Sequence, residues 1–236
     1  MGRIDVHAHL LPGVDDGSRT LDESIAIARR MAAAGYSRLV CTPHIWPQLD
    51  NTTVTTALRV AELQAALDAA DVNLTLHAGG EMHLSRQFLA TPAEDLVTYD
   101  NAGKYALFDF WTDTLPPYFE KAVRKMVDAG ITPILAHPER IEAVQRDPDV
   151  VARAGDLGLL LQCNLECVGE GETTLRGRLA TRWLRERRYF LLGSDVHRID
   201  TLGRRLLGLE RAADLVGAAE LDRLTIENPL RLITIH

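Results

Sequence analysis

Seven short apolar or β-branched runs, separated by longer segments of helical period, constrain the fold of this chain more than any other feature. The runs cover residues 3–9, 37–44, 72–81, 104–110, 132–140, 158–164 and 189–197. Helical periodicity marks residues 21–35, 55–70, 116–130, 148–158, 174–188 and 206–224. Such alternation predicts βα units around a mainly parallel sheet. A regular TIM barrel has eight βα units and this chain has seven. We therefore predict an α/β fold with a distorted (β/α)7 TIM-like barrel.

Length and composition narrow the class of protein. The 236 residues, 46% of them hydrophobic, can build one sizeable core, so a single domain over residues 1–236 is expected. No apolar run approaches the roughly 20 residues of a membrane helix, so no membrane insertion is expected. The three cysteines and the absence of an export signal indicate reduced thiols in a cytoplasmic protein. A net charge of −7 argues against a nucleic-acid partner.

Metal-binding residue types stand where the predicted strands end. His7 and His9 are two positions apart, so on a strand both side chains point the same way. In a parallel barrel all strand ends meet on one face, where active sites lie. Each polar end alone has an ordinary alternative, such as a loop histidine or a solvated carboxylate, but together they predict a site for Zn, Mn or Fe(II). The remaining strand ends carry His44, Glu81, Asp109, His137, Asn164, Asp195 and His197.

The motifs as a set resemble a known superfamily. "DVHAHLLPGVDDGS", "TPH", "GGE", "AHPER", "GSDVH" and "ENPLRL" are similar to the polymerase-and-histidinol-phosphatase (PHP) superfamily, from Asp5 to about Leu230. Within it, "HLLPGVDDG" and "KYALFDF…AHPER" most resemble the manganese-dependent bacterial protein-tyrosine phosphatases of capsule and exopolysaccharide loci. The resemblance implies the PHP fold and a site for three divalent ions. Mn is the expected metal, with Fe or Zn as alternatives.

The resemblance also implies how the ligands divide among the ions. Asp109 stands where the family commonly has Glu. Because its side chain is one methylene shorter, the second ion is expected to be held loosely or through water. The first ion would be bound by His7, His9, Glu81 and Asp195, the second by Glu81, Asp109 and His137, and the third by Asp16, His44 and His197.

A metal-bound hydroxide attacking phosphorus is the mechanism that the resemblance implies. Arg140 matches a phosphate-binding arginine, and Arg204 is similar to a second one, with Arg205 as the adjacent alternative. His44 or a metal-bound water would protonate the leaving group. Asp5 is expected to lie behind the ligands and orient a ligating histidine.

Three histidines are expected to be structural rather than metal-binding: His77, His83 and His236. A conventional cysteine phosphatase is excluded, because its loop needs an arginine six positions after the nucleophile. Those positions hold Pro47, Gly169 and Thr173.

The sequence is compatible with several functions. The resemblance implies a phosphotyrosine protein substrate, with a bacterial tyrosine autokinase as partner. A small-molecule phosphatase, such as a histidinol phosphatase, would share the ions and Arg140. An amidohydrolase-type hydrolase fits less well, since its bridging lysine would stand near Asp109. A non-catalytic metal-binding regulatory protein is the third alternative.

Overall fold

The computed structural model describes residues 2–234, so His236 lies outside the described residues. Within this range the backbone forms nine strand segments in place of seven continuous strands. Two predicted strands are each divided in two. Pro43, which has no N–H to donate, lies between the two halves of the strand predicted over residues 37–44. Gly79 and Gly80 lie between the two halves of the strand predicted over residues 72–81. The segments are β1 (Arg3–Ala8), β2 (Tyr36–Cys41), β3 (His44–Ile45), β4 (Thr75–Ala78), β5 (Glu81–His83), β6 (Tyr105–Asp109), β7 (Thr132–Ala136), β8 (Leu160–Asn164) and β9 (Leu191–Gly193).

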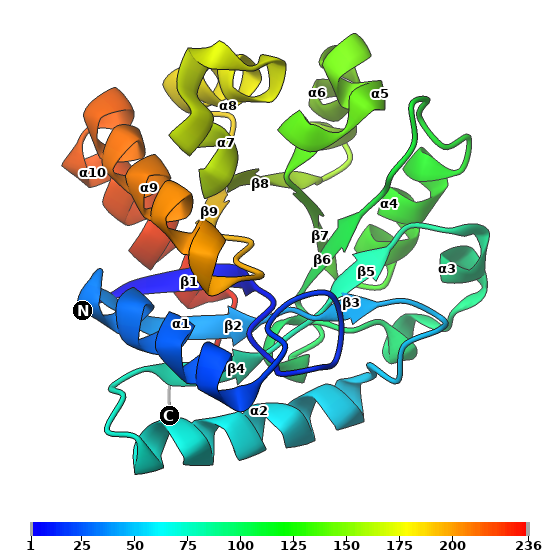
Figure 1. The fold of residues 1–236 in the computed structure, drawn as a ribbon. Coiled ribbons are helices and arrows are strands. Elements are labelled where there is room, and N and C mark those ends of the chain that lie inside the picture. The colour runs from blue at the N-terminus through cyan, green and yellow to red at the C-terminus, as the bar shows by residue number, and fades with distance from the viewer. Residues whose placement is uncertain (1, 235–236) are drawn as a thin grey trace.

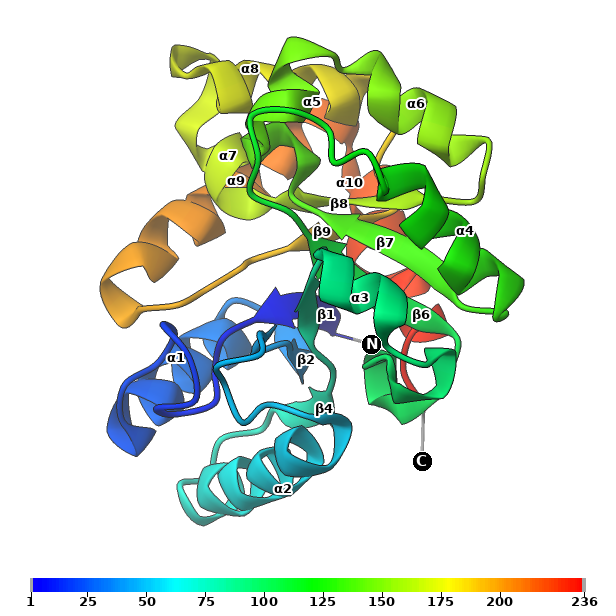
Figure 2. The same ribbon diagram turned by 90° about the vertical axis from the view of Figure 1, so that its right-hand side faces the viewer.

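All strand pairs are parallel, as predicted. The strand order is β1-β2-β4 in one sheet and β3-β5-β6-β7-β8-β9 in the other. A parallel bridge between Ala8 and Val196 joins the first strand to the segment that follows the last one. Hydrogen bonds of 2.9 Å from His9 N to Val196 O and 2.7 Å from Asp195 N to His7 O support that junction. The sheet therefore curls on itself (Figures 1 and 2), which confirms the predicted α/β barrel-like fold.

Helices cover the outside of the curled sheet (Figure 1). Each predicted helix is present, but the last one is divided at Gly217, whose φ of 80° suits glycine. Three short helices were not predicted, because five or six residues are too few to show a helical period. The helices are α1 (Leu21–Ala33), α2 (Thr53–Ala69), α3 (Arg86–Ala90), α4 (Phe119–Asp128), α5 (Glu142–Arg146), α6 (Asp149–Gly155), α7 (Leu165–Glu170), α8 (Leu175–Arg185), α9 (Leu202–Val216) and α10 (Ala218–Asp222).

Two apolar clusters fix the orientation of the polar strand ends. The larger one packs the helices against the sheet and includes Phe108 of β6. The smaller one includes Leu107 of β6 and Ile134 of β7, on the opposite face of these strands. Because strand side chains alternate, Asp109 shares the face of Leu107. The metal-binding residue types thus lie above an apolar floor inside the curl.

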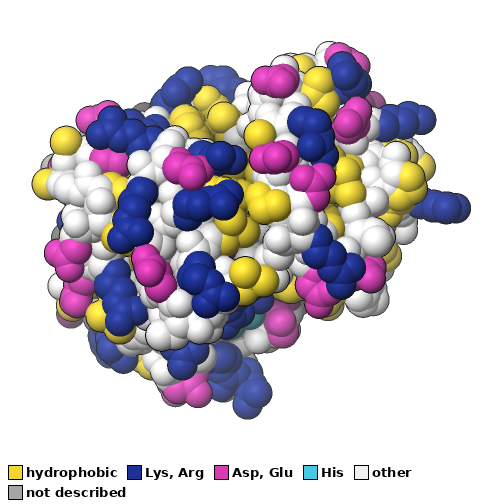
Figure 3. Space-filling view, turned by 90° about the horizontal axis from the view of Figure 1, so that it is seen from above, with side chains coloured by type: hydrophobic (Ala, Val, Ile, Leu, Met, Phe, Trp, Pro, Cys, Tyr) yellow, Lys and Arg dark blue, Asp and Glu magenta, His cyan; other side chains and the backbone are white. Residues whose placement is uncertain are grey.

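Figure 3 shows how charged side chains are distributed over one face of the molecule. There, Lys and Arg side chains are interspersed with Asp and Glu instead of forming one basic band (Figure 3). Over residues 2–234, no helix is both long and apolar enough to cross a membrane. Cys41, Cys163 and Cys167 are buried free thiols.

Candidate metal centre

Four buried side chains meet at the centre of the polar face. The Nε2 atoms of His7 and His9 lie 3.2 Å apart. Each of them lies 3.4 Å from Glu81 Oε2 and 3.4 Å from Asp195 Oδ1. Two imidazole nitrogens and two carboxylate oxygens thus face one common point, an arrangement that suits a borderline divalent cation.

Glu81 also reaches a second group of ligand types. Its Oε1 lies 3.0 Å from His137 Nε2. His7, Glu81 and His137 can each place one ligand atom within 4.8 Å of the others. Asp109 is not part of this group. Its Oδ1 lies 3.1 Å from His83 Nδ1, so His83 touches a candidate ligand instead of lying apart from the site.

A third group lies at the outer edge of the centre. Asp16 Oδ1 is 3.4 Å from His44 Nε2 and 3.3 Å from His197 Nε2. These three residues and His9 form a group within 4.8 Å. Of the nine predicted ligands, all of which are described, the structure therefore brings eight into compact groups and leaves Asp109 beside them.

Three histidines have fixed tautomers that leave Nε2 free for a metal. The Nδ1 atom of His7 lies 2.8 Å from Gln162 Oε1, and that of His9 lies 2.8 Å from Asp15 Oδ2. His197 Nδ1 lies 3.0 Å from the carbonyl oxygen of Asp195. Since each of these oxygens is an acceptor, Nδ1 carries the proton and Nε2 offers its lone pair. Gln162 and Asp15 were not predicted in this role.

Asp5 lies behind the ligands, as expected, but it contacts the backbone of His7 and not its imidazole ring. Its Oδ1 accepts from the backbone N–H of His7 at 3.3 Å and of Ser194 at 2.9 Å. Its Oδ2 accepts from the Ser194 hydroxyl at 2.5 Å. Asp5 thus ties the backbone of β1 to the segment after β9 and sets the position of His7 indirectly. No periodic pattern reveals that its partner would be Ser194, which is distant in sequence.

Two candidate ligands are among the six described residues other than glycine that have a positive φ. His137 has a φ of 34° and Asp195 a φ of 52°, in the left-handed region that residues other than glycine seldom adopt. Neighbours hold Asp195 in place: Asn164 Nδ2 donates to its Oδ2 at 2.7 Å, and Arg205 Nη2 donates to its carbonyl oxygen at 2.9 Å. Such strain persists only where the surroundings enforce it, and it is typical of functional sites.

The three arginines named from the sequence have different surroundings. Arg140 Nη1 lies 2.5 Å from Asp195 Oδ2, directly at the centre. Arg204 is exposed and its Nη1 lies 3.1 Å from Glu166 Oε1. Arg205 is buried and donates to the carbonyl oxygens of Ser194 and Asp195. Arg205 is therefore held by backbone carbonyls and by Glu166, whereas Arg140 and Arg204 have more freedom to contact an anion.

This difference predicts that two alanine substitutions change the free energy of unfolding by different amounts. Arg205→Ala is expected to lower the free energy of unfolding by about 2–3 kcal/mol, because two buried carbonyl oxygens lose a charged donor. Arg204→Ala is expected to change it by less than about 0.5 kcal/mol, since Arg204 is exposed. Urea unfolding of both variants measures the difference. Equal losses would contradict the assignment.

Opposing effects set the ionisation of the centre. Burial raises the pKa of Glu81 and Asp195, but the nearby histidines outweigh it and hold both pKa values well below their usual range. Burial lowers the pKa of His44, but Asp16 and Glu81 outweigh it and raise that pKa to about 9. The pKa of Asp109 is raised by its burial and by the charge of Glu81.

The hydrogen bonding of these groups tests whether they fit divalent ions. Among the described residues, both carboxylate oxygens of Glu81, Asp109 Oδ2, His44 Nδ1 and His137 Nδ1 are buried without a hydrogen-bond partner. A buried carboxylate without a partner is costly. A cation between Glu81 and the surrounding ring nitrogens would satisfy the two Glu81 oxygens, so the residues present fit the metals that the sequence predicts.

One further buried residue holds a neighbour of the candidate ligand Asp195. Glu139, which was not assigned a role, accepts from Asn164 N at 2.7 Å and from Tyr189 OH at 3.0 Å. Asn164 in turn donates to Asp195. Glu139 stands in the "AHPER" motif between His137 and Arg140, but only the fold shows that its side chain turns away from both.

Two relatives of this chain are named tyrosine-protein phosphatases. The chain is 26% identical to tyrosine-protein phosphatase CpsB of Streptococcus pneumoniae over 98% of both chains. It is 28% identical to tyrosine-protein phosphatase YwqE of Bacillus subtilis, over 67% of this chain and 63% of that one.

Solved structures share the fold. A structure described as belonging to the metal-dependent tyrosine phosphatases YwqE from Bacillus subtilis and CpsB from Streptococcus pneumoniae matches with a TM-score of 0.85 and 24% identity, over 99% of this chain and 96% of that one. The phosphotriesterase homology protein from Escherichia coli matches with a TM-score of 0.60 and 14% identity, over 99% of both chains. The family described as capsular polysaccharide synthesis, CpsB/CapC, matches residues 3–234, and the chain belongs to that family.

Proposed function

We propose that this chain is a metal-dependent protein-tyrosine phosphatase. The observation that carries the proposal is the convergence of His7, His9, Glu81 and Asp195 on one point, with Arg140 beside Asp195. The tyrosine phosphatases among its relatives support it. We propose three divalent ions, Mn first, and the nine ligands predicted from the sequence. When bound, such ions lower the pKa of a coordinated water toward 7 and so supply a nucleophile for attack on phosphorus.

The chain's own residues would bind and position the phosphate. Arg140 presents a guanidinium that can pair with two phosphate oxygens at once. Arg204, exposed in the first turn of α9, is the second candidate for this contact. A departing tyrosine phenolate has a pKa near 10, so it needs less protonation than an alkoxide. His44 stays the candidate proton donor that the sequence names.

Trp111 favours an aromatic substrate over a small polar one. Its side chain is 49% exposed, which is unusual for so large an apolar group. The Arg140 guanidinium lies over its ring, 5.2 Å from the centroid, and the His137 ring lies 5.7 Å away. The free face of Trp111 thus offers a stacking surface next to the phosphate-binding arginine. A phosphotyrosine would stack its ring on Trp111 and pair its phosphate with Arg140.

The physiological substrate that we propose is a phosphorylated bacterial tyrosine autokinase that acts in capsule or exopolysaccharide regulation. Membership of the capsular polysaccharide synthesis family supports this partner. A phosphotyrosine segment of the kinase would place its ring at Trp111 and its phosphate at Arg140.

A substrate comparison tests the proposed function. The purified chain, supplied in turn with manganese, zinc and ferrous iron, would be assayed on a phosphotyrosine peptide, on a chromogenic aryl phosphate and on histidinol phosphate. We expect kcat/KM for the phosphotyrosine peptide to exceed that for histidinol phosphate by about tenfold or more, with the highest rates in manganese. Faster hydrolysis of histidinol phosphate would favour the small-molecule alternative. No hydrolysis with any metal would contradict a catalytic role.

A further inference from the structure

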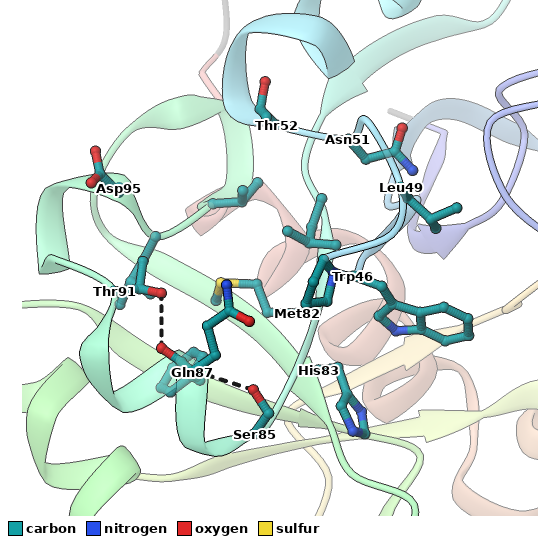
Figure 4. A pocket seen from close by; sticks show the side chains of 15 residues that line it. Trp46, Leu49, Asn51, Thr52, Met82, His83, Ser85, Gln87, Thr91 and Asp95 are labelled. Carbon is teal, nitrogen blue, oxygen red and sulfur yellow. Dashed lines mark hydrogen bonds between the residues drawn. The ribbon is translucent and has the colours of Figure 1, made fainter.

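A cavity of about 250 Å³ lies beside the candidate metal centre, between the strand pair β3–β5 and helix α3 (Figure 4). Trp46 and Leu49 lie on one side of it, and Thr91 and Asp95 on the other, with Gln87 between them. Its wall is partly polar and partly apolar. The apolar wall is formed by Ile45, Trp46, Leu49, Met82, Phe88 and Val97.

The cavity and the metal centre use opposite faces of the same strands. β3 pairs with β5 in the register His44 to Glu81 and Ile45 to Met82. Because strand side chains alternate, His44 and Glu81 face the centre while Ile45 and Met82 line the cavity. The two compartments are therefore separated by the thickness of one strand pair.

Two side chains at the edge of this strand pair touch both compartments. Trp46 lines the cavity and stacks on the His44 ring, with centroids 4.2 Å apart. His83 lines the cavity and contacts Asp109 at 3.1 Å. The cavity thus borders the candidate metal centre at these two side chains.

The walls of the cavity are fixed by specific contacts. Lys125 Nζ on α4 donates to the carbonyl oxygens of Phe88 at 3.2 Å and Leu89 at 3.0 Å, which holds the end of α3. A Cβ atom at Gly80 would lie 2.7 Å from Ile45 Cγ1 and 2.9 Å from Val97 Cγ1, so only glycine permits this packing. These contacts indicate a preformed cavity.

We propose that the cavity binds the apolar side chain of a residue adjacent to the phosphotyrosine in a protein substrate. The inference rests on the proposed function. Small-molecule sites usually measure about 300–1,000 Å³, so this cavity has room for one side chain and little more. Neighbouring residues of an extended peptide are about 3.3–3.6 Å apart. Because His83 both lines the cavity and contacts Asp109, a residue next to the phosphotyrosine is the part of a peptide substrate that would meet the cavity.

Peptides that differ in one flanking residue test the proposal on the full chain loaded with manganese. Leu, Ser or Asp would be placed next to the phosphotyrosine, on each side in turn, and a small aryl phosphate would be assayed in parallel. We expect kcat/KM for one Leu peptide to exceed that of the matched Ser peptide by about tenfold. The aryl phosphate reports the metal centre alone, because it cannot reach the cavity.

Substitutions at Gln87 test whether the preference for Leu depends on the cavity. Gln87 is exposed, and within residues 2–234 its side chain makes no hydrogen bond. Gln87→Trp is expected to fill the cavity and abolish the preference for Leu, without changing aryl phosphate hydrolysis. Gln87→Ala, the matched control, is expected to keep the preference.

The outcomes separate this inference from the proposed function. Equal kcat/KM for all peptides, with aryl phosphate still hydrolysed, would overturn the inference alone. A failure to hydrolyse any substrate would overturn the proposed function itself. If Gln87→Trp altered only the oligomeric state and left the peptide preference unchanged, the cavity would belong to a contact between copies of the chain, and the inference would be wrong.

Discussion

Glu81→Gln is expected to lower kcat/KM for aryl phosphate by about 10³-fold or more while the chain stays folded. Glu81 Oε2 lies 3.4 Å from His7 and from His9 and 3.1 Å from His44, and Oε1 lies 3.0 Å from His137. Gln keeps the shape of this side chain but loses its charge and one acceptor oxygen. A catalytic ion supplies several kcal/mol of transition-state stabilisation, and each 1.36 kcal/mol is about tenfold in rate.

A matched control and two measurements make this prediction specific. Glu220→Gln neutralises another buried glutamate, but one that pairs with Arg223 outside the centre. Both variants would be assayed for steady-state kinetics and for metal content after dialysis. Glu81→Gln should lose metal and activity together, whereas Glu220→Gln should keep both. A Glu81→Gln variant with more than about a tenth of the original activity would count against a shared ligand at this position.

Most of the candidate ligands could be placed from sequence because they stand at strand ends, whereas Asp16, in the loop after β1, was named only through the resemblance. His7 and His9 follow the first apolar run, and Glu81 and His137 follow later ones. Parallel strands bring their carboxyl ends together whatever lies between them, so a local pattern was enough to place distant residues on one face. The same logic predicted the curled parallel sheet.

The residues that support the ligands could not be predicted in this way. Gln162 orients the His7 ring across a separation of 155 residues. Asp5 joins Ser194 across 189 residues. Such contacts depend on side-chain rotamers and on the closure of the sheet, neither of which leaves a periodic signal. Asp109 was placed on the correct face, but only coordinates reveal that it contacts His83.

Removal of bound metal is the second change expected to have a large effect. Dialysis against a chelator should abolish hydrolysis and lower the melting temperature. An ion present at a hundred times its dissociation constant stabilises the folded chain by about 2.7 kcal/mol. For a chain of this length, 1 kcal/mol corresponds to about 2–4 °C, so each saturated site should contribute roughly 5–10 °C.

The metal-free chain is expected to remain folded, because its histidines and carboxylates pair with one another. Asp16 and Glu81 outweigh the burial of His44 and raise its pKa to about 9, so this imidazole is protonated at neutral pH when no metal is bound. A metal ligand must be the neutral imidazole. Metal binding near pH 7.5 should therefore release protons, which calorimetry in two buffers of different ionisation enthalpy would measure.

The stability gap between metal-loaded and metal-free protein should widen as the pH rises. The folded pKa of His44 lies above its ordinary value of 6.5. Its pairing therefore stabilises the metal-free chain fully below about pH 6.5, and this contribution is lost as the pH rises toward about 9. Over the same range, metal binding competes with fewer protons and becomes tighter. Scanning calorimetry at about pH 6.5 and 8.5, with and without manganese, measures both effects. A stability gap that narrows as the pH rises would mean that protonation of His44 does not compete with metal binding.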